Sequence, residues 1–142
     1  MKYIHIIFFA FFISISCSSK TLSKPLRRNI SEKKMYVIIE KHLKSLKKAI
    51  LYEEVKVPVP IKDYVFVSSM ICLTKEAINI ERHSYSSFPI MTKNDLNILE
   101  EWYKQYKDQI PRDCFVKWWN YHANQESTWE DLEQAEQCVM QL

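Results

Sequence analysis

Apolar residues are arranged in two ways along this chain, first as one continuous run and then as regularly spaced stripes. Residues 4–15 are almost all Ile, Phe and Ala, interrupted only by His5 and Ser14. From residue 31 onward, apolar residues recur every three or four positions, the spacing that places side chains on one face of an α-helix. The second pattern predicts a mainly helical domain.

The most regular stripe predicts a helix from Ser31 to about Tyr52. Ser31 is a favourable N-cap, Glu32 suits the first turn, and lysines occupy the other faces. The stripe itself consists of Met35, Ile39, Leu43, Leu46 and Ile50. This pattern is typical both of a helix lying on a membrane surface and of a core helix with a lysine-rich outer face. We favour the core helix, because the acidic C-terminal half can neutralise the lysines.

The middle of the chain is less clear. Apolar and other residues alternate along residues 55–61, which is typical of an extended segment. Pro58 and Pro60 make a linker or a sheet edge the expected structure there. The β-branched and aromatic content of residues 64–74 favours a strand, whereas a helical stripe runs through Phe66, Met70, Leu73, Ala77 and Ile80. We favour the helix, because no glycine turn follows to form a hairpin. The alternative for residues 64–83 is a pair of short strands, 64–71 and 77–82.

Three further helices are predicted in the C-terminal part. Thr92 and Asp95 suit the start of a helix that Pro111 ends, and the aromatic segment 114–122 predicts a short buried helix. Ser127 and Glu130 are spaced as a capping box for a last helix. Its apolar side would carry Trp129, Leu132, Ala135, Val139 and Leu142. Residues 31–142 are therefore expected to form one mainly α domain, a small bundle of four to five short helices with room for a short two-strand element.

The N-terminal run has the features of a signal peptide. Lys2 supplies a positive start, and the small residues Ser14 and Ser16 precede Cys17. The apolar run would span about 18 Å as a helix, less than the bilayer core of about 30 Å. We therefore expect residues 1–16 to be a signal peptide that is removed, and not a permanent membrane span.

The segment Ser14-Ile15-Ser16-Cys17, followed by Ser18-Ser19-Lys20, resembles the lipobox of bacterial lipoproteins. That family prefers Leu where Ser14 stands and often has Ala where Ile15 stands. The resemblance implies that Cys17 is lipidated, and that the protein is anchored in the inner or outer membrane of a cell envelope. Ordinary signal cleavage near Ser16 or Ser18, or an uncleaved anchor, is the alternative. Residues 17–30 would form the lipidated cysteine and a flexible tether.

Composition excludes several kinds of site. The chain has no glycine, which standard phosphate-binding loops, dinucleotide fingerprints, nucleophile elbows and calcium loops require. Four cysteines are present and none forms a CxxC pair. If Cys17 carries lipid, one disulfide and one thiol remain. We favour Cys114 with Cys138, although Cys72 could pair with either.

Charge is divided between the two halves. Residues 18–62 contain twelve Lys/Arg and four Asp/Glu, a net charge of +8, whereas residues 63–142 contain seven and thirteen, a net charge of −6. This asymmetry indicates either a basic arm for anionic lipid or pairing between the halves. Nucleic acid is not an expected partner of an exported protein.

No constellation predicts catalysis, a metal site or a cofactor. Cys114 and His122 are too far apart on one helix to react together, and a cysteine nucleophile served by His83 is the alternative. His122 and Glu126 are only two potential metal ligands. The aromatic residues between Trp102 and Trp129 suit a sugar platform less well than a core.

We therefore expect a binding or structural lipoprotein of the envelope. Its protein partner would bind either the acidic C-terminal helix, at Trp129, Glu133 and Glu136, or the groove between that helix and the aromatic segment. The alternatives are an immunity-type inhibitor of a toxin or lytic enzyme, and a hydrolase that uses Cys114 or Cys72.

Overall fold

A computed structural model describes residues 23–140, apart from residues 53, 75–88 and 125. Its elements are α1 (Glu32–Ala49), β1 (Val57–Pro58), α2 (Ile61–Thr74), β2 (Ile90–Met91), α3 (Lys93–Tyr106), the 3₁₀ turn η1 (Lys107–Gln109), α4 (Arg112–Ala123) and α5 (Trp129–Glu136). The predicted fold class is confirmed: a small helical bundle with one short two-strand element.

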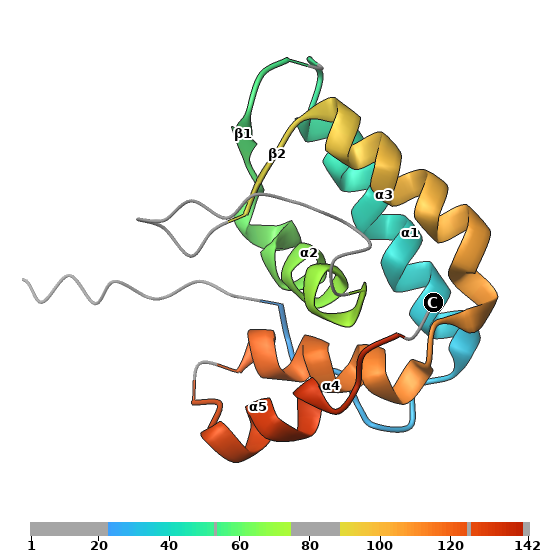
Figure 1. Cartoon of the computed structure of the whole chain (residues 1–142), viewed down its shortest axis with the longest axis vertical. Helices are drawn as coiled ribbons and strands as arrows, with labels where there is room; N and C mark the ends of the chain where they lie inside the picture. Colours follow the sequence, from blue (N-terminus) through green and yellow to red (C-terminus); the bar gives the residue numbers. More distant parts are fainter. Residues whose placement is uncertain (1–22, 53, 75–88, 125, 141–142) are drawn as a thin grey trace, which may run out of the picture.

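The helices pack in a series in which α2 is central. α2 lies against both α1 and α4, α3 covers α1, and α5 packs on α4 (Figure 1). β1 and β2 form an antiparallel pair in which Val57 lies opposite Met91 and Pro58 opposite Ile90. This pair connects the segment after α1 with the segment before α3.

α1 forms as its sequence predicts, and its apolar stripe faces the core. The Ser31 hydroxyl accepts a hydrogen bond from the Lys34 amide at 3.2 Å, which satisfies one donor of the first turn. The buried residues of the helix are Met35, Ile39, Leu43 and Leu46. The helix ends at Ala49, earlier than Tyr52, but its apolar face is not available for lying on a membrane.

Residues 61–74 form a helix, so the helical interpretation of residues 64–74 is correct and a strand at 64–71 is wrong. Ala77, Ile80 and the alternative strand at 77–82 lie outside the described residues. α2 is buried on nearly all sides, at Asp63, Val65, Phe66, Val67, Ser68, Ser69, Met70, Leu73 and Thr74. A helix without a polar face has no clear apolar stripe, which explains why its sequence resembled a strand.

The start of α5 differs from the prediction. The capping box is formed by Thr128 and Asp131, with the Asp131 amide 3.2 Å from the Thr128 hydroxyl, and not by Ser127 and Glu130. The Ser127 hydroxyl instead donates to the Tyr121 carbonyl at 2.8 Å. Trp129 was predicted to lie on the apolar side of this helix with the other apolar residues, but its side chain is 86% exposed, so that part of the prediction is wrong.

Candidate binding surface on α4 and α5

The N-terminal segment is fixed to α4 by three hydrogen bonds. The Leu26 amide donates to Asn120 Oδ1 at 2.6 Å, and Asn120 Nδ2 donates to the Leu26 carbonyl at 2.9 Å. The Trp119 indole donates to the Lys24 carbonyl at 3.0 Å. Residues 24–26, which the sequence assigned to a flexible tether, are therefore attached to the helical domain.

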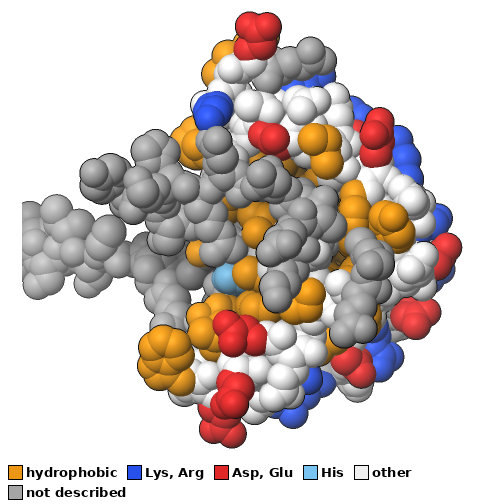
Figure 2. Space-filling model, viewed as in Figure 1, with side chains coloured by type: hydrophobic (Ala, Val, Ile, Leu, Met, Phe, Trp, Pro, Cys, Tyr) orange, Lys and Arg blue, Asp and Glu red, His pale blue; other side chains and the backbone are white. Residues whose placement is uncertain are grey.

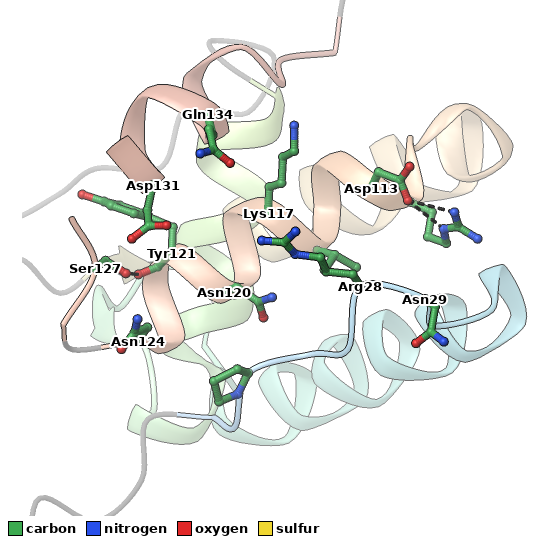
Figure 3. Close-up of a pocket in the computed structure, with 13 residues that line it drawn as sticks. Arg28, Asn29, Asp113, Lys117, Asn120, Tyr121, Asn124, Ser127, Asp131 and Gln134 are labelled. Carbon is green, nitrogen blue, oxygen red and sulfur yellow. Dashed lines mark hydrogen bonds and ion pairs between the residues drawn. The ribbon is translucent and has the colours of Figure 1, made fainter. Parts of the chain in front are cut away.

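A groove lies between this segment, α4 and α5 (Figure 3). It encloses about 600 Å³ and is lined mainly by polar side chains. Figure 3 shows Arg28 and Lys117 over one side of α4, with Asp131 and Gln134 reaching toward them from α5. Because cationic, anionic and amide groups are all present, the groove suits a polar ligand or chain segment.

Asp131 has two roles in the groove. Hydrogen bonds from the Thr128 amide and hydroxyl hold the pKa of its carboxyl group below the ordinary value, and the positive charge of Arg28 acts in the same direction. Asp131 therefore stays ionised while it caps α5. The groove keeps a fixed negative charge beside its cationic side chains.

The predicted partner surface lies on the outer side of α5. Trp129, Glu133 and Glu136 are spaced by four and three residues, so they follow one another along one face of the helix. Trp129 is 86% exposed, and both glutamates are exposed. Figure 2 shows acidic side chains gathered over α5 at the lower edge of the molecule. We call these three residues the α5 stripe.

The chain beyond α5 is tied back to α4 and α2. A disulfide joins Cys114 and Cys138, whose Cα atoms are 5.0 Å apart, and the Trp118 indole donates to the Cys138 carbonyl at 2.7 Å. The Met140 amide donates to the Leu73 carbonyl at 2.9 Å. Only Ala135 of α5 is buried, so these contacts are needed to hold the short helix in place.

Cys114 is part of this disulfide, so it has no thiol to act as a nucleophile. The structure instead places His122 beside Cys72 of α2, with Nε2 at 3.6 Å from Sγ. The His122 ring stacks on Trp118 at a centroid distance of 6.0 Å. The sequence could not show this pair, because packing of α2 on α4 brings together residues far apart in the chain. His83 lies outside the described residues.

The structure also bears on the sugar platform and the metal site that were considered from the sequence. Trp102, Trp118 and Trp119 are each at most 7% exposed, so they form core and not a sugar platform. Among the described residues, no group of three or more His, Cys, Asp or Glu side chains is arranged to hold a metal ion.

A second polar cluster was missed by the sequence reasoning. The side chain of Asp63 is only 1% exposed. Its Oδ2 accepts a hydrogen bond from Ser45 Oγ at 2.8 Å, and its Oδ1 lies 2.8 Å from His42 Nδ1. His42 stacks on Phe66 with ring centroids 5.2 Å apart. An acidic residue in the first turn of α2 gave no sign in the sequence that it would be buried against α1.

Within the part of the chain that the structure describes, no helix combines the length and the apolar character needed to cross a bilayer. Comparisons with protein-family models, with curated proteins and with solved structures give no match.

Proposed function

We propose that this protein is an exported, lipid-anchored module that binds a protein partner in the cell envelope through the α5 stripe. The observation that carries the proposal is Trp129, an exposed tryptophan bordered by acidic side chains. A tryptophan side chain is buried in most proteins, and at interfaces it is among the residues that contribute most to affinity.

The acidic side chains of α5 are available to a partner. Glu130, Glu133 and Glu136 are exposed and form no ion pair with any described residue. The last turn of α5 contains no basic residue. A partner with a basic surface and a pocket for an indole ring would therefore match both the charge and the shape of the stripe.

The location of the proposed activity comes from the N-terminal sequence. Residues 1–16 have the pattern of a signal peptide, and Ser14 to Cys17 resembles a lipobox. Two or three acyl chains on Cys17 would exceed the two-signal threshold for stable membrane attachment. Intact mass measurement and membrane fractionation of a Cys17→Ser variant test this part separately from partner binding.

Site-specific photo-crosslinking in the native envelope tests the binding surface. The photoreactive residue p-benzoylphenylalanine replaces Glu133 in the full chain, which leaves Trp129 in place. We expect one discrete cross-linked protein, whose yield falls at least about tenfold when Trp129→Ala is added, because truncating an interface hot spot costs about 2 kcal/mol or more.

The matched controls use exposed apolar residues on other helices. The photoreactive residue at Val37 of α1, which is 57% exposed, should give no such product, and Ile98→Ala on α3 should leave the Glu133 product unchanged. A Glu133 product that persists with Trp129→Ala, or an equal product from Val37, would contradict binding through the α5 stripe.

Inhibition of a toxin or lytic enzyme is a second candidate function. It is favoured by Glu130, Glu133 and Glu136 of α5, which form no ion pair within the described part of the chain. A cross-linked partner that is a basic enzyme, and whose activity the purified protein blocks, would establish this candidate. The double reversal Glu133→Lys with Glu136→Lys should then abolish the block, because it places positive charge against a basic surface.

A further inference from the structure

A second pocket lies on the other side of the N-terminal segment from the α4–α5 groove. Ser23, Lys24 and Leu26 line this pocket, whereas Pro25, Arg28 and Asn29 line the groove. Its other walls are α1, the first turn of α2 and Trp119 of α4, and it encloses about 610 Å³. The segment that leads from the N-terminus therefore forms one edge of this pocket.

The pocket is strongly basic. Five of its lining residues are lysines, and its one acidic residue is Asp63, which gives a net charge of +4 with His42 neutral. The lysines are Lys24, Lys41, Lys44, Lys48 and Lys62, all of them exposed. We call this site the lysine pocket.

Nothing among the described residues neutralises these lysines. None of the five forms an ion pair there, and the carboxylate of Asp63 is buried and already engaged by His42 and Ser45. The expectation that the acidic half of the chain would neutralise the lysines of α1 is met, among the described residues, by one lysine–carboxylate pair, Lys47 with Glu100 at 3.2 Å. The lysine pocket therefore retains its positive potential.

The lysine pocket has lysines of α1 along its rim and a base whose side chains are held by contacts with one another. Lys41, Lys44 and Lys48 follow one another along one face of α1, spaced by three and four residues. His42 forms part of the base, held by Asp63 and by ring contacts with Phe66 and with Trp119, whose centroid is 5.4 Å away. The lysine side chains therefore surround a concave surface that is already ordered.

We infer that the lysine pocket binds the phosphate-bearing headgroup of an anionic phospholipid and so orients the domain on the bilayer. The charge fits a phosphate group, for which lysine is a common protein ligand. Five residues separate Cys17 from Ser23, which is six steps along the backbone, so the pocket edge is at most about 20 Å from the proposed anchor. The inference rests on that anchor only for bringing the pocket to a membrane.

The contact would be electrostatic and not an insertion of α1 into the bilayer. Met35, Ile39 and Leu43 point into the core, so the helix has no apolar face left to insert. Each lysine near an anionic surface strengthens binding about fivefold at low salt, and screening weakens this effect as salt rises. Binding at the lysine pocket should therefore be sensitive to both lysine number and ionic strength.

A titration in neutral detergent tests the pocket without depending on the anchor or on the α5 partner. The exported full chain, purified in dodecyl maltoside, is titrated with dihexanoyl-phosphatidylglycerol while amide NMR signals are followed. We expect saturable shifts at Lys44, Ser45 and Lys62, and no saturable shifts with dihexanoyl-phosphatidylcholine. The double variant Lys44→Gln with Lys48→Gln should bind phosphatidylglycerol about 25-fold more weakly, the product of two fivefold losses.

The matched control is Lys33→Gln with Lys34→Gln, which removes the same charge from exposed positions of α1 outside the pocket. If the two double variants lose the same affinity for phosphatidylglycerol, binding depends only on net charge, and the proposed site is wrong. Inorganic phosphate binding as tightly as phosphatidylglycerol would overturn the headgroup assignment in favour of a free anion. A mass spectrum without lipid on Cys17 would refute the anchor while leaving a positive titration to stand for the pocket.

Discussion

Breaking the disulfide between Cys114 and Cys138 tests how the chain holds α5 in place. The perturbation is the double variant Cys114→Ala with Cys138→Ala, which removes the cross-link without leaving one of these two cysteines as an unpaired thiol. α5 has few apolar contacts of its own, since Ala135 is its only buried residue and Leu132 is partly buried. The position of the α5 stripe should therefore depend on this bond.

The size of the effect follows from the loop that the disulfide closes. The two cysteines are 24 residues apart. Closing a loop of this length lowers the conformational entropy of the unfolded chain, which raises its free energy by about 3.5 kcal/mol at 25 °C. The Trp118 indole and the Leu73 carbonyl still hold the backbone at Cys138 and Met140 in the variant. We therefore expect a folded protein whose free energy of unfolding is lower by about 3.5 kcal/mol.

Urea unfolding followed by far-UV circular dichroism measures the loss, and hydrogen exchange of the α5 amides measures where it acts. Reduction of the unmodified chain with dithiothreitol is the control, because it should reproduce the same loss. A decrease below about 1 kcal/mol, with α5 exchange unchanged, would refute the reasoning. The hydrogen bonds of Trp118 and Met140 would then be sufficient to hold the C-terminal segment.

Three further substitutions have defined outcomes. Burial raises the pKa of Tyr103 to about 12 from 10.0. The unfolded state therefore loses this proton at lower pH than the folded state, so the free energy of unfolding does not depend on this group below pH 10 and falls as the pH rises toward 12. Tyr103→Phe should reduce this alkaline slope in urea unfolding, leaving the part that comes from Tyr36, whose pKa is also raised by burial. It should also stabilise the fold by about 1 kcal/mol at pH 7, because the buried Tyr103 hydroxyl has no hydrogen-bond partner among the described residues. Asp63→Ala should destabilise the fold by about 3 kcal/mol, since it leaves His42 and Ser45 without their shared acceptor; an unchanged melting temperature would contradict this. Cys72→Ser should fold and keep the cross-link from Glu133 within twofold, whereas loss of the protein's cellular effect with binding intact would favour the hydrolase alternative.

The outer helices could be predicted because their sequences carry a stripe and a cap together. α1 and α3 each show apolar residues on one face and a capping residue at the start, Ser31 and Thr92, and both caps are present in the structure. α5 carries two overlapping capping sequences, and only the local backbone decides that Thr128 and not Ser127 is the cap. A sequence pattern locates such a helix but does not fix its first residue.

The internal contacts could not be predicted, because they depend on which helices become neighbours. Nothing near Asn120 in the chain indicates that its amide would pair with the backbone of Leu26, and nothing near Cys72 indicates His122. The same limit applies to Asp63, whose burial follows from packing of α2 on α1. Asn120 of α4 and Asp63 and Cys72 of α2 thus take part in contacts between elements that the sequence around each of them does not indicate.

The divided charge of the chain connects the two proposals. Opposite charges in the two halves suggested that the halves neutralise each other, but in the described residues Lys47 with Glu100 is the one Lys–carboxylate pair that joins them. α1 packs against α2 and α3, while α5 packs against α4, so the lysine pocket and the α5 stripe remain separate charged surfaces. Two uncompensated surfaces of opposite sign on one small domain suit two different contacts at once. Under the two proposals, the basic surface would meet anionic headgroups near the proposed anchor, and the acidic surface would stay available for a basic protein partner.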